Sequence, residues 1–197
     1  MRVIAGTFRS RILKSLKGLA LRPTSDRLRE TLFNVLGPGV SGSRFLDLFA
    51  GTGAIGIEAL SRGAREVVFI ENHPPAVKLI RRNLESLEIT FGVTVYTADA
   101  LRGLELFVPK NKGAALGFDF IFLDPPYAAA ENYARVLEFL GAADLLAPGG
   151  LVIAEHRRKF DLCEEAGILR RVRVLKQGDA ALSFYRCRAD GETGSAQ

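Results

Sequence analysis

The stretch FLDLFAGTGAIGIEAL, at residues 45–60, decides the fold. It begins as an apolar run interrupted by one acid, Asp47, turns through Gly51 and Gly53, and continues with helix-like apolar spacing. This pattern predicts a buried strand, a tight glycine turn, and a helix whose N-terminus lies over the end of the strand. Glycine permits φ > 0 and a close ligand, and the first helical turn offers free N–H groups. The turn is therefore a candidate ligand site.

The glycine turn has more than one interpretation. Residues 51–56 match G-x-G-x-x-G, and Glu71 follows at about the 20-residue distance that the dinucleotide fingerprint requires. A plain structural turn would bind nothing. The wider string, with Asp47 in the strand and FAGTG after it, resembles the first motif of class I S-adenosylmethionine-dependent methyltransferases. That resemblance implies a loop around the methionine part of the cofactor.

The chain around this stretch alternates between two patterns. Strand-like runs at 44–49, 66–71, 93–98, 118–123 and 150–155 are separated by helix-like segments at 53–62, 74–87, 99–107 and 130–140. Such alternation predicts βαβ units and a parallel sheet covered on both faces. We then expect a short helix at 159–166 and an antiparallel hairpin of strands 169–174 and 181–186. The prediction is an α/β fold with the Rossmann-like, seven-stranded, mostly parallel sheet of class I methyltransferases.

Three regions are predicted along the chain. Residues 1–39 form a basic extension, with a small hairpin at 2–13 and a helix at 25–36 that ends at Gly37-Pro38-Gly39. Residues 40–188 form the methyltransferase domain. The small polar residues 189–197 are expected to be a disordered tail.

The charge of the chain is concentrated at its start. The net charge is +5, yet residues 1–30 alone carry +6 and the remainder −1. An anionic partner is therefore expected to dock on the first segment. The predicted RNA contacts are Arg2, Arg9, Arg11, Arg22 and Arg29.

Composition excludes several classes of protein. The sequence has no apolar run of the ~20 residues that a membrane span needs, and no signal-peptide core at its N-terminus. Its 2 cysteines and 2 histidines have no metal-ligand spacing. We expect a cytoplasmic monomer without a metal.

An acid lies near the end of each of the first five strand-like runs. In a parallel sheet these positions share one edge, where ligands bind. Acids gathered there repel one another unless a cationic or hydrogen-bond-donating ligand lies between them. Strand-ending and helix-capping acids are the plain alternative, and it suits Asp99 and Glu155 individually. S-adenosylmethionine supplies the complement through its sulfonium, ammonium, ribose hydroxyls and adenine amine. The acids are Asp47, Glu71, Asp99, Asp124 and Glu155.

Resemblance to the methyltransferases implies a role for most of these positions. Asp47 and the glycine turn would face the methionine part, Glu71 would accept the ribose hydroxyls, and Asp99 with Ala100 would lie beside the adenine. Glu155 has no such role and is interpreted as structural. The complete implied cofactor set is Asp47, Phe49, Ala50, Gly51, Thr52, Gly53, Glu71, Asn72, Asp99, Ala100 and Asp124.

The tetrapeptide Asp124-Pro125-Pro126-Tyr127 follows an apolar strand and indicates the chemistry. Its prolines stiffen the loop and remove N–H donors, which leaves a carboxylate and a rigid carbonyl as acceptors. Two acceptors would hold both N–H groups of guanine N2 or adenine N6 and aim the lone pair at a methyl carbon. Tyr127 would stack on a base that has left its helix. The candidate catalytic residues are therefore Asp124, Pro125 and Tyr127; a plain turn is the alternative.

Four segments together resemble one family, the RsmD-type bacterial small-subunit ribosomal RNA guanine-N2 methyltransferases. They are VIAGTFRSR, LRPTSDRLRETLFNVL, LDLFAGTGAIGIEALSRGA and FLDPPY. The resemblance implies methyl transfer from S-adenosylmethionine to one guanine of 16S ribosomal RNA, in an assembling or assembled particle.

Three other functions stay open on the residues alone. They are an adenine-N6 methyltransferase of RNA or DNA, an NAD-dependent oxidoreductase, and a non-catalytic RNA-binding assembly factor. The first shares the Asp-Pro-Pro-Tyr motif, the second leaves that motif unexplained, and the third leaves Asp124 and the glycine turn without a purpose.

Overall fold

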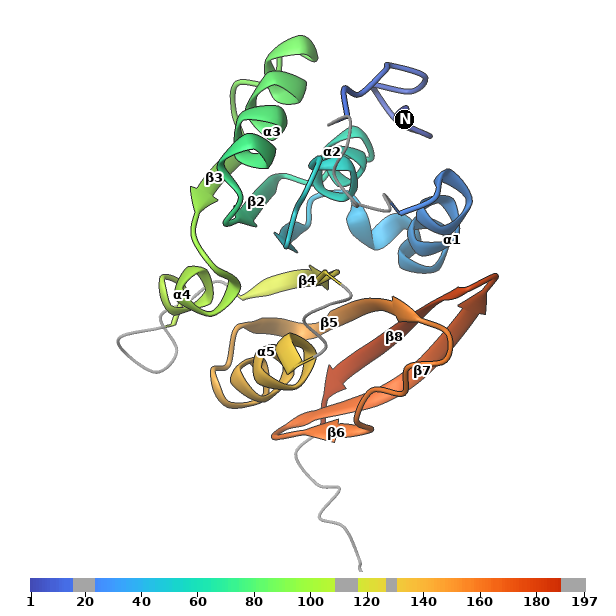
Figure 1. The fold of residues 1–197 in the computed structure, drawn as a ribbon, viewed down its shortest axis with the longest axis vertical. Helices are drawn as coiled ribbons and strands as arrows, with labels where there is room; N and C mark the ends of the chain where they lie inside the picture. Colours follow the sequence, from blue (N-terminus) through green and yellow to red (C-terminus); the bar gives the residue numbers. More distant parts are fainter. Residues whose placement is uncertain (16–23, 109–116, 127–130, 189–197) are drawn as a thin grey trace, which may run out of the picture.

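An eight-stranded sheet forms the centre of the protein (Figure 1). The computed structural model describes residues 1–15, 24–108, 117–126 and 131–188. The strand order is β3-β2-β1-β4-β5-β8-β7-β6. Strands β1 to β5 are parallel, and β8, β7 and β6 continue the sheet in antiparallel pairs. The strands are β1 Arg44–Leu48, β2 Glu66–Glu71, β3 Val93–Thr97, β4 Phe118–Leu123, β5 Leu146–Arg157, β6 Glu165–Ala166, β7 Leu169–Gln177 and β8 Ala180–Cys187.

This architecture confirms the predicted α/β sheet with its antiparallel C-terminal hairpin. The two-residue strand β6 extends the expected seven strands to eight. The predicted helix at 159–166 is wrong, because this segment is irregular up to residue 164 and then forms β6, with β7 bound to it. The guanidinium of Arg171 in β7 donates to the Asp161 carboxylate (2.9 Å) and the Leu162 carbonyl (2.7 Å). These tertiary bonds outweigh the local helical pattern.

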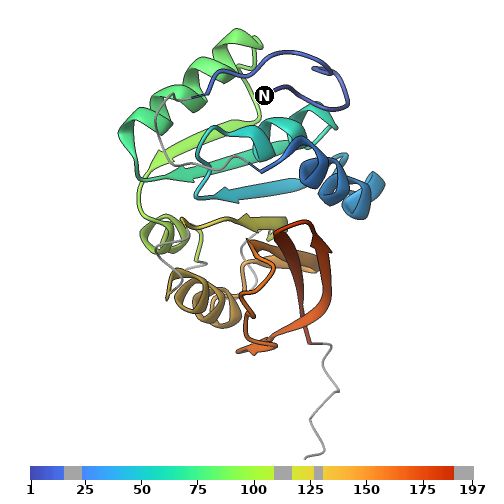
Figure 2. The same cartoon turned by 45° about the vertical axis from the view of Figure 1, so that its right-hand side comes forward.

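Helices cover both faces of the sheet (Figures 1 and 2). They are α1 Asp26–Leu36, α2 Ala54–Ser61, α3 Pro74–Ser86, α4 Ala100–Glu105 and α5 Glu131–Ala142, with the 3-10 helix η1 at Gly37–Val40. Successive side chains of a strand point to opposite faces. Accordingly, Phe45 packs in one apolar cluster with α1, α2 and α3, whereas Leu46 packs in another with α4 and α5.

The N-terminal arm, residues 1–15, is a short hairpin with one antiparallel bridge between Arg2 and Ile12. Its apolar residues Val3 and Leu13 are buried in the same cluster as α1 and α2. The helix that follows is α1, which begins after Ser25, whose hydroxyl accepts a bond from the Leu28 N–H at 3.1 Å. This confirms the predicted helix and its cap. The boundary at residue 39 stays a prediction, and the expected tail at 189–197 lies outside the described residues.

Candidate functional site

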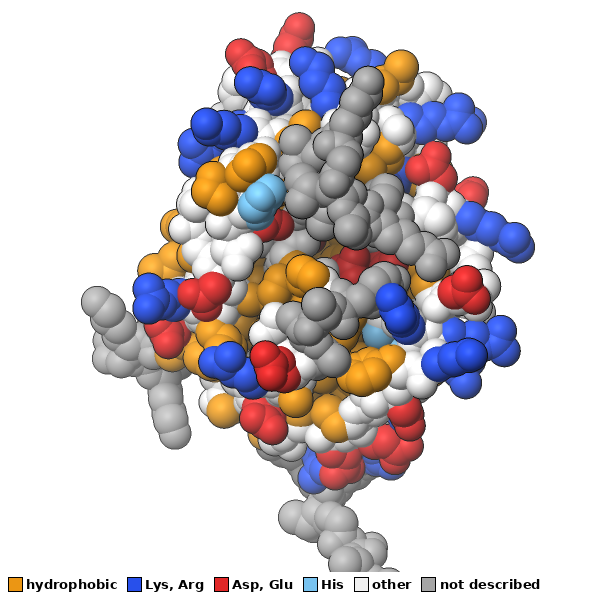
Figure 3. Space-filling view, in the orientation of Figure 1, with side chains coloured by type: hydrophobic (Ala, Val, Ile, Leu, Met, Phe, Trp, Pro, Cys, Tyr) orange, Lys and Arg blue, Asp and Glu red, His pale blue; other side chains and the backbone are white. Residues whose placement is uncertain are grey.

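The carboxyl edge of the parallel strands brings the predicted site together. Strand β1 lies between β2 and β4, with Leu48 beside Ile70 on one side and beside Leu123 on the other. The glycine turn after β1 and Asp124 after β4 are therefore neighbours, although they are far apart in the chain. In Figure 3, acidic atoms are visible near the middle of the face, while Lys and Arg side chains lie around its periphery.

The glycine turn adopts a conformation that few residues tolerate. Gly51 and Gly53 have φ of 55° and 75°, and Phe49, which carries a side chain, has φ of 59°. The Gly53 N–H donates to the Ala50 carbonyl at 2.7 Å, and Gly53 is the N-cap of helix α2. A Cβ on Gly53 would lie 3.2 Å from the Ile80 side chain, whereas one on Gly51 would meet nothing closer than 3.8 Å. The turn is thus packed under Gly53 and open at Gly51.

Two carboxylates accept hydrogen bonds from the backbone of this turn and of the helix that follows it. Asp47, 2% exposed, accepts a bond from the Gly56 N–H at 3.0 Å. Glu71 accepts from the Gly51 N–H at 2.8 Å with one oxygen and from the His73 N–H at 2.8 Å with the other. A carboxylate oxygen can accept two bonds, so each oxygen of Glu71 retains capacity for a ligand.

These bonds also bear on the dinucleotide interpretation. A pyrophosphate in that motif is bound by the N–H groups of the glycine turn and of the helix N-terminus. Here the N–H groups of Gly51 and Gly56 donate to carboxylates, and those carboxylates would repel a phosphate. The geometry therefore disfavours NAD.

Asp124 lies in a negatively charged environment. Burial raises its pKa well above the ordinary value, and the charges of Glu155 and Asp47 raise it further. Burial likewise raises the pKa of Asp47, with Glu71 adding to the effect and the bond from Gly56 opposing it. The charged groups acting on Asp124 are thus acids. A ligand that donates hydrogen bonds or carries positive charge would relieve their repulsion.

Glu155, near the end of β5, connects this edge to the segment before α1. It is 4% exposed, and its carboxylate accepts a bond from the Thr24 hydroxyl at 2.6 Å. Its carbonyl accepts from the Tyr133 hydroxyl, also at 2.6 Å. These contacts agree with the structural role that the sequence suggested for Glu155.

The remaining predicted cofactor residues take different positions. Asp99 is exposed and caps α4 by accepting from the Arg102 N–H at 3.1 Å, and Ala100 is buried as the first residue of that helix. Asn72 is exposed directly after β2. Pro125 is buried beside Asp124. The candidate Tyr127 lies outside the described residues.

The predicted RNA-binding arginines divide into two groups. Arg2, Arg9 and Arg11 are exposed on the N-terminal arm. Arg29 is 0% exposed, so its prediction as an RNA contact is wrong. Its guanidinium instead donates to the Arg2 carbonyl and the Asp26 carboxylate (3.0 Å) and lies 3.8 Å from the Glu58 carboxylate. Arg22 lies outside the described residues.

A cavity of about 370 Å³ lies between the arm and α1. Arg2, Arg9 and Arg27 line it together with the acids Asp26 and Glu30. None of the strand-end acids lines it. This cavity therefore belongs to the basic N-terminal region and is separate from the carboxyl edge.

Two buried polar residues near the site had not been predicted. Glu58 of α2 accepts bonds from the Ile4 N–H (2.8 Å) and the Ala5 N–H (3.0 Å) of the arm. Asn83 of α3 joins the arm to the glycine turn. Their positions in the sequence could have revealed them. Each is a polar residue on an otherwise apolar helix face, where a buried polar group requires a hydrogen-bond partner.

Two further expectations concern metals and membranes. In residues 1–15, 24–108, 117–126 and 131–188, no group of three or more potential metal ligands comes together. No helix in the described part of the chain has the length and hydropathy that a membrane crossing requires.

Comparison with known proteins identifies the family. The model of the family described as Conserved hypothetical protein 95 matches residues 1–186. The Putative rRNA methyltransferase YlbH of Bacillus subtilis (strain 168) is 39% identical over 188 residues, which cover 95% of this chain and 100% of that protein. The Ribosomal RNA small subunit methyltransferase D of Escherichia coli (strain K12) is 33% identical over 195 residues, or 98% and 93% of the two chains.

A solved structure agrees with these relatives. The putative methyltransferase yhhF from Escherichia coli superposes with a TM-score of 0.80 at 29% identity, covering 96% of this chain and 99% of its own. Fold, motifs and relatives confirm the RsmD-type family that the sequence indicated. The chain therefore belongs to the Conserved hypothetical protein 95 family.

Proposed function

We propose that this protein transfers a methyl group from S-adenosylmethionine to the exocyclic N2 of one guanine in small-subunit (16S) ribosomal RNA. Support comes from membership of the family and from the names of its relatives, which include ribosomal RNA small subunit methyltransferase D. The geometry that carries the proposal is the position of Asp124 beside the glycine turn at one edge of the sheet.

The residues of the carboxyl edge fit S-adenosylmethionine. When bound, this cofactor supplies an electrophilic methyl group on a positively charged sulfur. Glu71 retains acceptor capacity for hydroxyl groups, and the open side of Gly51 lets a ligand approach the backbone. The negative charges of Asp47, Asp124 and Glu155 favour a cationic ligand over an anionic one.

Asp124 and the backbone beside it would orient the amine of the base. Its carboxylate and a carbonyl of the proline segment accept the two N–H groups, so the lone pair on nitrogen is directed at the methyl carbon. Because its surroundings raise its pKa, Asp124 is also suited to accept the proton that the methylated nitrogen loses. Buried Pro125 has no N–H to compete for these acceptors.

The RNA would bind through the N-terminal arm. Exposed Arg2, Arg9 and Arg11 supply positive charge for phosphates, and the cavity beside the arm carries two of them. The proposal includes a monomeric cytoplasmic enzyme, without a metal, that acts on an assembling or assembled small subunit.

Nucleoside mass spectrometry tests this proposal. Small subunits from cells lacking the gene are incubated with purified protein and S-adenosylmethionine, and the RNA is then digested. We expect N2-methylguanosine with the wild type and a rate about 10²–10³-fold lower with Asp124→Asn, as for loss of one preorganised bonding group. Asp119→Asn, at the opposite end of the same strand, is the matched control and should stay within a few-fold of wild type. N6-methyladenosine, or no methylation at all, would reject the guanine proposal.

A further inference from the structure

Asn83 is a buried amide on the inner face of α3. Its residue is 0% exposed, and its neighbours on that face, Val77, Ile80 and Leu84, are apolar. An amide in such a position costs stability unless its polar atoms are bonded. The partners of Asn83 therefore reveal what it holds.

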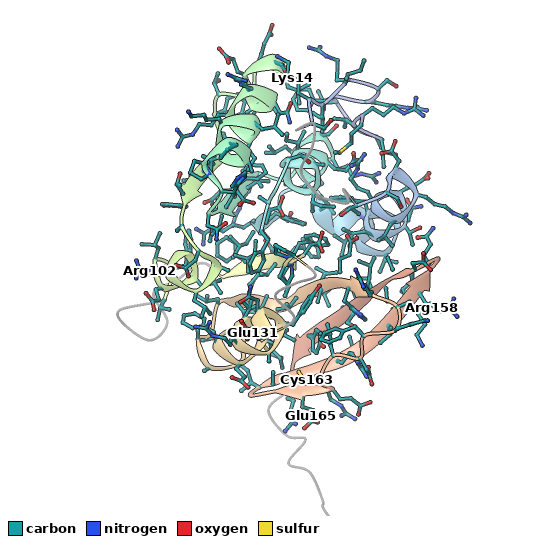
Figure 4. All side chains as sticks on the ribbon, in the orientation of Figure 1. Lys14, Arg102, Glu131, Arg158, Cys163 and Glu165 are labelled. Carbon is teal, nitrogen blue, oxygen red and sulfur yellow. The ribbon has the colours of Figure 1, made fainter. Side chains whose placement is uncertain are left out.

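Those partners come from two segments that are distant in the chain. The Asn83 side-chain oxygen accepts from the Lys14 N–H at 2.9 Å. Its amide nitrogen donates to the Lys14 carbonyl at 3.2 Å and to the Thr52 carbonyl at 3.0 Å. The Lys14 N–H requires an acceptor and the two carbonyls require donors, so only one orientation of the amide satisfies all three bonds. Figure 4 shows Lys14 of the arm beside α3.

On the cofactor side, Asn83 holds the central peptide of the glycine turn. Thr52 lies between Gly51 and Gly53, two residues that permit many conformations and do not fix the turn by themselves. A trans peptide points its C=O and N–H in opposite directions. Because Asn83 binds the Thr52 carbonyl, the Gly53 N–H is directed at the Ala50 carbonyl, to which it donates at 2.7 Å. Asn83 thereby helps to fix the backbone that faces the cofactor.

On the RNA side, the arm is bound to the same two helices. Glu58 and Ser61 of α2 hold the backbone of Ile4, Ala5 and Phe8. The Arg11 guanidinium donates to the Ser86 carbonyl near the end of α3 at 3.0 Å. Helices α2 and α3 both begin at the carboxyl edge of the sheet. Asn83 is therefore a contact through which a shift of the arm at Lys14 can reach the glycine turn.

We propose that Asn83 is a positioning residue that couples RNA binding by the arm to cofactor binding by the glycine turn. RNA fixes the arm in its docked position, the arm fixes Asn83, and Asn83 fixes the Thr52–Gly53 peptide. Each ligand then raises the affinity for the other by the same factor, since coupling is reciprocal. This inference rests on the proposed function, and it adds to it a positive cooperativity between substrate and cofactor binding.

The test measures S-adenosylhomocysteine binding by calorimetry, with and without saturating unmethylated small ribosomal subunits. For the wild type we expect the subunits to tighten binding at least five-fold, within the usual range of coupling. Asn83→Asp keeps the acceptor for Lys14 but removes both donated bonds. We expect it to weaken binding about ten-fold without RNA and to reduce the coupling to less than two-fold.

Two further variants separate positioning from general stability. Glu85→Ala, at an exposed position of the same helix, should leave affinity and coupling unchanged. Gly6→Ala loosens the arm at α2 without contacting Asn83 or the turn, and it should lower the coupling while the affinity without RNA changes less than in Asn83→Asp. If Asn83→Asp does not fold, Gly6→Ala tests whether the docked arm carries the coupling, and unchanged coupling in this variant would overturn the inference.

The outcomes distinguish this inference from the function on which it rests. A wild-type protein that binds no S-adenosylhomocysteine contradicts the proposed function itself. A wild type that binds it equally well with and without subunits overturns the coupling while leaving the function intact. A lower melting temperature in Asn83→Asp with unchanged coupling would show that Asn83 is only structural.

Discussion

At the scale of single residues, charge and burial decide what each side chain does. Burial raises the pKa of Asp124, directly after β4, and the charges of Glu155 in β5 and Asp47 in β1 raise it further. Arg29 is buried between acids, whereas Arg27 two positions earlier on the same helix is exposed. The environment of Asp124 and the burial of Arg29 each lead to a test in which one variant is compared with a matched control variant.

Replacing Glu155 by Gln should move the acidic limb of the pH–rate profile to lower pH. Asp124 must be ionised to accept the amine bonds, so the rate rises with pH through the pKa of this carboxyl. The charge of Glu155 raises that pKa, and removing the charge lowers it. The measurement is single-turnover methylation as a function of pH. Glu66→Gln, at the opposite end of β2, is the control. If the acidic limb of the pH–rate profile does not move in Glu155→Gln, the limb reports the ionisation of a group other than Asp124.

Replacing Arg29 by Ala should lower the free energy of unfolding by about 1–3 kcal/mol, because it leaves the Arg2 carbonyl without its donor and removes a buried cation from beside Glu58, which keeps Arg62 as an ion-pair partner. Burial already lowers the pKa of Arg29, and the nearby acids oppose this change. Urea unfolding at neutral pH measures the effect. The exposed Arg27→Ala variant should lose less than about 0.5 kcal/mol. Equal losses in both variants would contradict a buried structural role for Arg29.

At the scale of elements, the docking of the N-terminal arm on α2 is one of the contacts that join the two predicted parts of the chain. Ser61 of α2 binds the arm through its backbone and its side chain. Its carbonyl accepts a hydrogen bond from the Thr7 N–H at 2.8 Å, and its hydroxyl accepts one from the Phe8 N–H at 2.9 Å. Gly6 lies directly against this residue. A Cβ at Gly6 would be placed 1.7 Å from the Ser61 carbonyl oxygen. Only glycine lets the arm approach α2 so closely.

Gly6→Ala should therefore be more destabilising than Gly42→Ala. The two glycines have similar φ, 80° and 75°, so the cost of the left-handed backbone is shared. A Cβ at Gly42 meets nothing within 4 Å. The difference between the two variants isolates the steric clash, which we expect to cost about 1–3 kcal/mol. Thermal unfolding of both proteins provides the measurement, and equal melting temperatures would mean that the arm does not pack as described.

At the scale of the whole molecule, positive and negative charge are segregated. The segment 1–30 carries a net +6, while buried acids gather at the carboxyl edge. In the proposed function, this arrangement would let phosphates bind at the arm while a cationic cofactor binds at the sheet. Figure 4 places Arg158 beside the β7–β8 hairpin, far from the arm, where it serves as a distant basic control.

Replacing Arg9 and Arg11 together by Ala should weaken RNA binding and flatten its salt dependence. Each lost phosphate contact reduces the slope of log K against log salt by about 0.7 for single-stranded RNA. Filter binding over a range of salt concentrations measures the slope. Arg158→Ala combined with Lys159→Ala removes the same charge elsewhere and should change the slope less. Without RNA, the affinity of the Arg9/Arg11 double variant for S-adenosylhomocysteine should match that of the wild type. An unchanged salt slope in this variant would show that the two arginines are solvated and do not contact phosphates.

The sequence by itself determined the elements and the kind of site. The glycine turn, the alternating strands and helices, and the hairpin of β7 and β8 follow from local periodicity and from glycines that permit φ > 0. The acids at the strand ends follow as well, because a parallel sheet places all carboxyl ends on one edge.

Only the tertiary structure decided which polar residues are buried and what they bind. Thr24 and Glu155 are 131 positions apart in the chain, and Lys14 and Asn83 are 69 apart. Arg29 has the same local pattern as an exposed arginine, yet it lies beneath the arm beside Glu58. The expected helix at 159–166 gave way to bonds from Arg171 for the same reason. Local sequence carries no record of distant partners, and those partners set burial, pKa and the coupling between the arm and the glycine turn.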